Sequence, residues 1–361
     1  MISVWIEPRA RPSQLMSLAS PLLALLLTVL SGGVMFAARG LDPLALLYVY
    51  FLDPLATLWS LEELAVKAAP LVLIGAGLAV SFRAGVWNIG AEGQLVAGAI
   101  VGSAVPVLWH DWQSPWVLPV MLGAAAFGGA LYAALPAILK NRAGVNEILT
   151  SLMLVYVAQY FLDWLVRGPW RDPQGFNFPR SVTFEGWQRL PVLGDSRLHL
   201  GVGLALLAVA AVHVLQRHSL VGFSMRIGGE APRASVFSGF SRSGTVWLGF
   251  MLSGALAGLA GICEVAGPSG HLQPAVSPGY GFTAIIVAFL GRLHAAGVLL
   301  AGLLLALTYL GAEAAQMDMG VSVKTSQVFQ GMLLFFILAC DTAVRHRFRM
   351  AIGRSGSKRG Q

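Results

Sequence analysis

Charged and amide side chains interrupt the apolar sequence of this chain at residues 82–94, which read FRAGVWNIGAEGQ. Long runs that are almost free of charge flank this segment on both sides. A carboxylate or an amide at bilayer depth is costly unless it lines a wet cavity or pairs with other polar groups. Asn88, Glu92 and Gln94 are therefore predicted to offer hydrogen bonds to a polar solute along a pathway. Hydrogen bonding from helix to helix is the alternative explanation.

A second polar group opens a later apolar run, at residues 146–154 (NEILTSLML). Asn146, Glu147 and Thr150 belong to it, and Glu147 and Thr150 are three residues apart, so they can share one face of a helix. We give two interpretations equal weight here, because the group lies close to the expected inner interface. Either these side chains line the same pathway, or they hydrogen-bond between helices.

The composition places the chain in the membrane class. Of its 361 residues, 56% are hydrophobic and 11% are charged, whereas soluble domains carry about 25% charged residues. The 42 glycines suit close helix packing in lipid. The net charge of +7 comes from basic residues between apolar runs and near the C-terminus, which indicates orientation in a membrane better than nucleic-acid binding.

The apolar runs predict an all-α, polytopic membrane protein with about ten transmembrane helices in one transmembrane domain over residues 1–361. A spanning helix needs about 20 mostly apolar residues. The first run is too long for a cleaved signal peptide and is expected to be retained. The run at 281–292 is short and is expected to be tilted, broken or re-entrant. The candidate spans are 15–38, 65–82, 88–109, 117–139, 147–166, 198–216, 244–266, 281–292, 295–316 and 326–343.

Basic residues set the expected orientation. With the N-terminus inside, two thirds of the lysines and arginines fall in inside segments, so both termini are predicted to be cytoplasmic. Residues 168–197 then form an extracytoplasmic loop, which either caps the protein or serves as a docking surface. Residues 217–243 form a cytoplasmic segment, and residues 345–361 form a basic cytoplasmic tail attracted to anionic lipid.

We find no sequence pattern that predicts catalysis, a cofactor or a metal site. The seven histidines include no pair at metal-binding helical spacing. A phosphate-binding P-loop, a nucleophile elbow and a cysteine pair with zinc spacing are all missing from the sequence. The sequence therefore predicts no catalytic residues, no metal and no ATP site on this chain.

The cytoplasmic segment at 217–243 has its own pattern. Residues 231–237 are predicted to form a short helix on the inner face, with Glu230 near its N-terminus. Arg226 and Arg233 would then project to solvent or to a partner. An ordinary basic loop would explain the same residues.

Together these motifs resemble a known family. The segments FRAGVWNIGAEGQ, NEILTSLML, GFSMRIGGEAPRASVFSGFSR, LSGALAGLAG and GYGFTAIIVAFLGR follow one another in the same order as in permease subunits of ABC importers. The closest group resembles the nucleoside and simple-sugar uptake permeases, which are related to the ribose and branched-chain amino acid permeases. The likeness covers the chain from about residue 60 onward.

This resemblance implies a single transmembrane permease domain in a bacterial inner membrane. A separate cytoplasmic subunit would bind and hydrolyse ATP, a related second permease would complete the path, and an extracytoplasmic protein would deliver the solute. Membrane lipid would surround the assembly, and nucleic acid would have no part in it. The resemblance also assigns coupling to the ATPase to a short segment. Its residues are Gly222, Arg226, Gly229, Glu230, Pro232, Arg233 and Ala234.

The chain departs from the family pattern at three places. Ser235 follows Ala234 where a second alanine is common, Leu293 and His294 replace a usual Asn-Pro pair, and Thr283 replaces an acidic residue. None of these departures removes a span or the coupling segment.

The resulting hypothesis is a permease that imports a nucleoside-like or simple-sugar solute by alternating access. Branched-chain amino acids are the alternative within the same class. A secondary transporter that uses Glu92 as its titrating group, and a purely structural membrane-assembly protein, are the alternatives outside it. We expect the Glu92 carboxylate to hydrogen-bond to neighbouring backbone rather than to carry protons.

Overall fold

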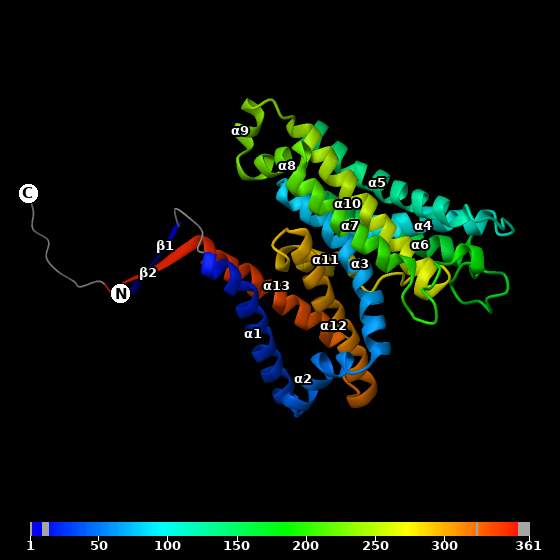
Figure 1. Ribbon diagram of the computed structural model, residues 1–361, viewed down its shortest axis with the longest axis horizontal. Helices are drawn as coiled ribbons and strands as arrows, with labels where there is room; N and C mark the ends of the chain where they lie inside the picture. The colour runs from blue at the N-terminus through cyan, green and yellow to red at the C-terminus, as the bar shows by residue number, and fades with distance from the viewer. Residues whose placement is uncertain (1, 9–13, 323, 353–361) are drawn as a thin grey trace, which may run out of the picture. The chain divides into compact units, whose positions relative to one another are not determined.

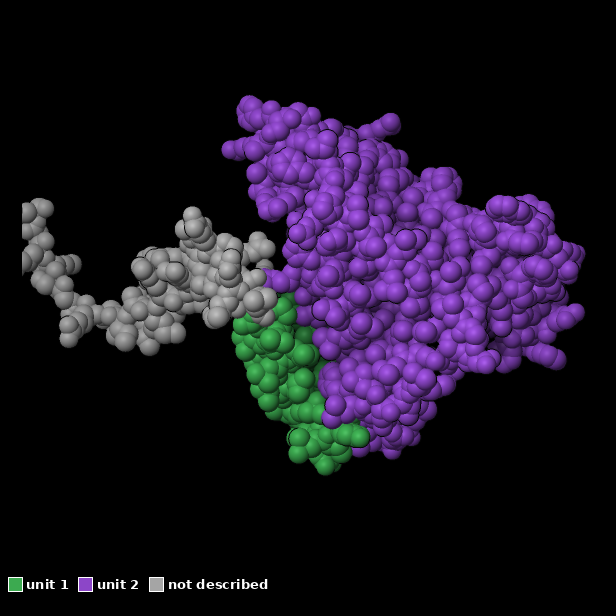
Figure 2. All heavy atoms as spheres, viewed as in Figure 1, with its two compact units in different colours: residues 1–48, 321–361 green, residues 49–320 purple. Residues whose placement is uncertain are grey.

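The computed structural model describes residues 2–8, 14–322 and 324–352. The chain divides into two compact units, which Figure 2 colours separately. Unit 1 contains residues 1–48 and 321–361, and unit 2 contains residues 49–320. The prediction of one permease domain over the whole chain stays a prediction.

Unit 1 is built on two helices from the two ends of the chain. Helix α1 (Gln14–Ala38) packs against α13 (Lys324–Arg345), where the rings of Phe36 and Phe329 lie 5.4 Å apart. Strand β1 (Ile2–Pro8) pairs antiparallel with β2 (His346–Ile352). The sequence does not predict these strands, and residues 353–361 of the predicted tail lie outside the described residues.

Unit 2 is a bundle of long apolar helices, which Figure 1 shows running side by side. Short helices α2 (Pro43–Phe51) and η1 (Asp53–Leu55), which the sequence does not predict, precede the long helices along the chain. The long helices are α3 (Leu58–Arg83), α4 (Ala91–Leu108), α5 (Val117–Ala143), α6 (Glu147–Arg167), α7 (Leu200–His218), α10 (Arg242–Glu264) and α12 (Ala295–Met319). The shorter elements are η2 (Gly186–Gln188), α8 (Leu220–Glu230), α9 (Pro232–Phe237), η3 (Val265–Ser269) and α11 (Tyr280–Leu290).

Each of the ten predicted spans coincides with a helix. In the described part of the chain, eight helices are long and apolar enough to cross a membrane. Helix α13 is apolar only over Gln327–Cys340. Helix α11 has 11 residues and is about 16 Å long, roughly half the thickness of the hydrocarbon core. The prediction of an all-helical polytopic membrane protein is therefore confirmed, although two of the predicted spans, in α11 and α13, are short rather than one. Helix α11 cannot cross a bilayer by itself.

The core of unit 2 forms around α3, which is buried on all sides from Ala68 to Phe82. A helix that is apolar all round must lie inside a bundle. Helix α10 packs against α3, α4 and α5, and small residues permit the close approach. A side chain on Gly98 or Gly129 would collide with the backbone of α10 at Gly258. Such packing is typical of helices in membranes, where van der Waals contact replaces the hydrophobic driving force.

The helices of unit 2 run between two ends that differ in charge. At one end, here called the basic end, the segments 83–87, 140–148, 216–246 and 291–294 lie together around shared cavities and hydrogen bonds. The predicted outside loop, 168–197, lies at the opposite end with the η3 segment. The distribution of lysines and arginines in the sequence assigns these two groups of segments to opposite sides of the membrane.

The loop at 168–197 is an ordered structure. The backbone N–H groups of Ser181 and Phe184 donate to the carbonyl oxygens of Leu272 and Gly270, both at 2.8 Å. The Leu190 N–H donates to the Ala266 oxygen at 2.9 Å. The loop therefore covers the η3 segment, and its role as a cap over the pore or as a docking surface stays a prediction.

Candidate functional site

The first predicted motif forms a tight turn that runs back into the bundle between α3 and α4. Helix α3 ends at Arg83, and Gly85 then takes a left-handed conformation with φ +71°, which glycine adopts without a steric penalty. The Ser81 hydroxyl donates to the Val86 oxygen at 2.8 Å, and the Val86 N–H donates to the Ser81 oxygen at 3.0 Å. These two bonds reverse the chain, so the next residues lie beside the middle of α10.

Asn88 and Gln94 form a closed hydrogen-bonded network with α10. The Asn88 amide nitrogen donates to Gln94 Oε1 and to Ser253 Oγ, both at 2.8 Å. Gln94 Nε2 donates back to Asn88 Oδ1 at 2.9 Å, and the Gly90 N–H donates to the same oxygen at 3.1 Å. Asn88, Gln94 and Ser253 are all buried. Since their polar groups bond to each other, the network joins the turn, α4 and the midpoint of α10.

Glu92 connects α4 to the short helix α11. Its Oε2 accepts the N–H of Gly281 at 2.6 Å, and the Ser277 side chain hydrogen-bonds to the same carboxyl group. Gly281 is the second residue of α11, and the N–H groups of a first helical turn have no partner within the helix. The partial positive charge at a helix N-terminus also favours an anion there. Glu92 therefore caps α11 inside the bundle. The expected hydrogen bond between Glu92 and the backbone is present, but the backbone group belongs to Gly281, which is distant in the sequence rather than neighbouring.

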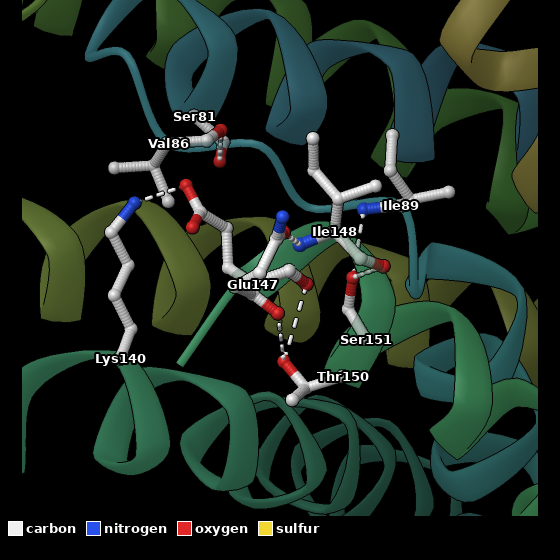
Figure 3. A network of polar contacts seen from close by, with 9 residues as sticks. Ser81, Val86, Ile89, Lys140, Glu147, Ile148, Thr150 and Ser151 are labelled. Atoms are coloured by element: carbon white, nitrogen blue, oxygen red, sulfur yellow. Dashed lines mark hydrogen bonds and ion pairs between the residues drawn. The ribbon is translucent and has the colours of Figure 1, made fainter. Parts of the chain in front are cut away.

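The second predicted group surrounds the N-terminus of α6 at the basic end (Figure 3). Asn146 Oδ1 caps the helix by accepting the Ile148 N–H at 2.9 Å. Glu147 forms an ion pair with Lys140 at the end of α5. The Thr150 hydroxyl donates to the Asn146 oxygen at 3.1 Å. These three residues stabilise the corner between α5 and α6.

This corner borders a large polar cavity. The cavity has a volume of about 780 Å³, and its lining includes Lys140, Asn146, Glu147, Ile148 and Arg242. The six predicted pathway residues thus form two groups. Asn88, Glu92 and Gln94 are sealed within the bundle, whereas the other three lie at the edge of the cavity. Contact with solute remains a prediction for both groups.

The predicted cytoplasmic segment contains two helices rather than one. The short helix expected at 231–237 is present as α9, with Pro232 at its first position, but α8 before it is not predicted from the sequence. Arg226 and Glu230 form an exposed i,i+4 ion pair at 3.1 Å on α8. Arg233 and Ala234 are exposed on α9. The expectation that both arginines project outward is confirmed.

Two glycines of this segment hold it against the bundle. A Cβ on Gly222 would collide with the Leu215 oxygen at the end of α7, and one on Gly229 would collide with the Arg83 oxygen and lie 3.0 Å from the Gly85 nitrogen. Between α9 and the turn at 84–87 lies a cavity of about 240 Å³. The α8–α9 pair therefore contacts the backbone of the turn that carries Asn88.

Electrostatics at the basic end keep one histidine neutral. His294 precedes α12, and burial lowers its pKa, reinforced by the positive charges of Arg83 and Arg292. A lowered pKa leaves the imidazole uncharged at pH 7. His294 therefore adds no positive charge to this end.

Comparison with known proteins assigns the chain to a family. Residues 60–338 match the family described as "Branched-chain amino acid transport system / permease component". The chain belongs to this family. Its membership and its apolar helices make this permease a multi-pass protein of the bacterial inner membrane.

Three curated relatives cover most of the permease. The glucose ABC transporter permease TsgB13 of Haloferax volcanii is 35% identical, with 99% of this chain and 96% of the relative covered. The guanosine ABC transporter permease NupP of Bacillus subtilis is 30% identical, with 92% and 96% covered. The nucleoside ABC transporter permease NupB of Lactococcus lactis is 27% identical, with 88% and 89% covered. No solved structure matches the permease.

The structure adds polar contacts that the sequence did not predict. Ser253 completes the Asn88 network, and its position within the LSGALAGLAG segment was the available signal. At the opposite end of unit 2, Lys67 pairs with Glu313 at 2.9 Å, and Arg197 pairs with Glu63 at 2.8 Å. The i,i+4 spacing of Glu63 and Lys67 at the start of an apolar run could have indicated this cluster.

Proposed function

We propose that this permease imports a nucleoside-like or simple-sugar solute by alternating access, driven by ATP hydrolysis on a partner subunit. The printed functions of the relatives, which are glucose, guanosine and nucleoside permeases, support the solute class. Branched-chain amino acids are the second candidate, favoured only by the description of the family. ATP is the ligand of the partner, and this chain holds no catalytic residues of its own.

The proposed complex has three other members. A cytoplasmic ATP-binding subunit docks on the exposed surface of α8 and α9, through Arg226, Arg233 and Ala234. A second, related permease forms the other wall of the path. An extracytoplasmic binding protein delivers solute to the end that carries the 168–197 loop. This arrangement makes the basic end cytoplasmic, together with both termini, as the excess of basic residues there favours.

Coupling in this proposal passes through backbone contacts. Movement of the ATPase displaces α8, and Gly229 transmits the displacement to the Arg83–Gly85 backbone because no side chain separates them. The turn then moves with Asn88, which is bonded to Ser253 on α10. Packed helices switch between discrete arrangements rather than deform continuously. The contact of α8 with the turn is the observation that carries the proposal.

Reconstitution tests the proposal. The permease, its ATP-binding partner, the second permease and the binding protein are placed in proteoliposomes, and uptake of radiolabelled D-glucose and guanosine is measured. We expect uptake that requires ATP in the compartment that the ATP-binding subunit faces. Uptake should stop when this subunit is omitted. Accumulation against a gradient by the permeases alone would contradict the proposal.

An ion-coupled mechanism that uses Glu92 has less support. The Glu92 carboxylate is buried and is engaged by the first turn of α11. A group that carries protons must meet water on each side in turn, whereas this one is enclosed by protein. The Glu92 variants described in the Discussion separate the two mechanisms.

A further inference from the structure

Helix α6 packs against the rest of unit 2 through one face only. Its buried residues, which include Ser151, Val155, Ala158 and Leu162, recur every three or four positions and so share one face, which packs against α4. The opposite face has no neighbour in the described chain. Leu149, Met153, Tyr156, Tyr160 and Trp164 lie along it, and all are exposed.

The chemistry of this face differs from that of other exposed helix faces. On α5 the exposed side chains include Phe127, Leu131 and Leu135, and on α7 they include Leu206 and Leu207. Apart from residues near the helix ends, such as the exposed His213 of α7, these faces are apolar and suit contact with lipid. On α6, by contrast, Tyr156 is 49% exposed and Tyr160 is 74% exposed. Gln159 is also exposed, on the flank of the same face.

These polar groups lie at the depth of the bilayer midplane. Tyr156 is about 14 Å along the axis from Glu147 and about 16 Å from Arg167, at 1.5 Å per residue. Aromatic residues near helix ends are explained by the membrane interface, which accounts for Trp164. The membrane interface does not explain Tyr156 or Gln159, because both lie far from the ends of the helix.

The three side chains lack partners in the described chain. Among its hydrogen bonds, none involves the hydroxyl of Tyr156 or Tyr160 or the side-chain amide of Gln159. Tyr132 on α5 shows the contrast, because its hydroxyl donates to the Leu154 oxygen at 2.6 Å. Lipid tails offer no hydrogen bonds, and a polar group left unpaired there costs several kcal/mol. The face must therefore meet water, solute or another protein.

Two observations favour a wet path over a second helix. Membrane helices pack through small residues, and the exposed face of α6 carries large ones. The face also leads to the polar cavity at the basic end. Ile148 lines that cavity. Leu152 lies four residues after Ile148, and Gln159 lies seven residues after Leu152, so the three side chains form one row along the helix.

We propose that Tyr156, Gln159 and Tyr160 form the solute-contacting surface of the translocation path, which rests on the proposed function of the permease. The solute is an uncharged ring that bears hydroxyl groups, such as a pyranose or a ribose with a heterocyclic base. The phenol faces pack against the ring, and the hydroxyls and amide exchange hydrogen bonds with it. The nearest charged group on the helix, Asp163, pairs with Arg167 at 2.7 Å.

Cysteine accessibility in the full complex tests this surface without requiring a known solute. Cys263 and Cys340 are first replaced with alanine, and Tyr156→Cys, Gln159→Cys and Tyr160→Cys are made singly. A charged methanethiosulfonate reagent reacts with thiolates, which form in water and not in lipid. Leu131→Cys and Leu207→Cys are matched controls on exposed apolar faces.

We expect labelling of the three positions at least tenfold faster than at the controls, in the nucleotide-free or the vanadate-trapped complex. D-glucose or guanosine should slow it. Labelling no faster than at the controls in both states would overturn the proposal that this face lines the path. If the cysteine variants then also lost the second permease on purification, the face would be identified as a contact between subunits. Fast labelling that neither compound slows would overturn the solute class. Uptake by the unmodified complex tests the proposed function separately, because labelling needs no uptake.

Discussion

The hydrogen bond from Gly281 to Glu92 predicts a structural role that can be measured. In the Glu92→Ala variant, the buried Gly281 N–H at the start of α11 loses its acceptor. Hydrogen bonds to a charged group contribute about 1.5–3 kcal/mol, and a buried donor left unpaired costs a similar amount. For a chain of this size, such a loss lowers the apparent melting temperature by about 2–4 °C.

Glu92→Gln separates the cap from a proton carrier. The amide oxygen still accepts the Gly281 N–H, so we expect less than half of the destabilisation and substantial ATP-dependent uptake. Uptake should also survive a proton uncoupler when ATP is maintained. The measurements are thermal unfolding of the purified complex and uptake by proteoliposomes. Glu313→Gln is the control, since its partly exposed pair with Lys67 contributes at most about 1 kcal/mol.

Two results would refute this reasoning. If Glu92→Ala unfolds at the temperature of the unmodified protein, the carboxylate does not hold α11. If Glu92→Gln is stable but inactive, and the uncoupler stops uptake by the unmodified complex at constant ATP, Glu92 is a titrating group. The permease would then be ion-coupled.

Three further predictions concern the turn and helices α8 and α9. Gly229→Ala places a methyl group against the backbone of the turn, so it should cost about 1–3 kcal/mol and reduce solute-stimulated ATPase activity. Gly228→Ala, whose methyl group would meet only ordinary contacts, should behave as unmodified protein. Arg226→Glu with Arg233→Glu should weaken co-purification of the ATP-binding subunit about tenfold and make it less salt-dependent, and unchanged recovery would reject the docking surface. In the Asn88→Ala variant, the buried partners of Asn88 lose their hydrogen bonds, so the free energy of unfolding should fall by about 1–3 kcal/mol and the melting temperature should fall with it. An unchanged melting temperature would show that the network is dispensable.

The sequence was sufficient to predict the long helices because their signal is local. Runs of about 20 apolar residues identified the eight long spans, and the shortness of 281–292 agrees with the 11 residues of α11. The helix at 231–237 was predicted from Glu230 and the flanking glycines. Helix α8 was missed because its glycines, which contact neighbouring backbone, have low helix propensity and resemble a loop in the sequence.

Partners distant in the sequence could not be predicted in the same way. Asn88 and Ser253 are 165 positions apart, and Glu92 and Gly281 are 189 apart. A polar motif in an apolar chain shows that hydrogen bonds are needed, but the motif does not specify whether solute or protein provides them. The periodicity of α6 likewise defines two faces, and only the packing against α4 determines that the face with Tyr156 and Tyr160 is the exposed one.

The arrangement of the polar groups has a consequence for how the permease changes conformation. The turn at 84–90 contacts α8 at one end and is bonded to α10 through Asn88 at the other. Breaking the buried Asn88 network would strand several polar groups at once, each costing about 1–3 kcal/mol. Moving the turn, α4 and α10 together costs none of these bonds. Helix α11 is held to the same group, because Gly281 donates to Glu92 and the ring of Phe289 stacks on those of Phe82 and Trp87. Alternating access in this permease should therefore move the turn, α4, α10 and α11 together.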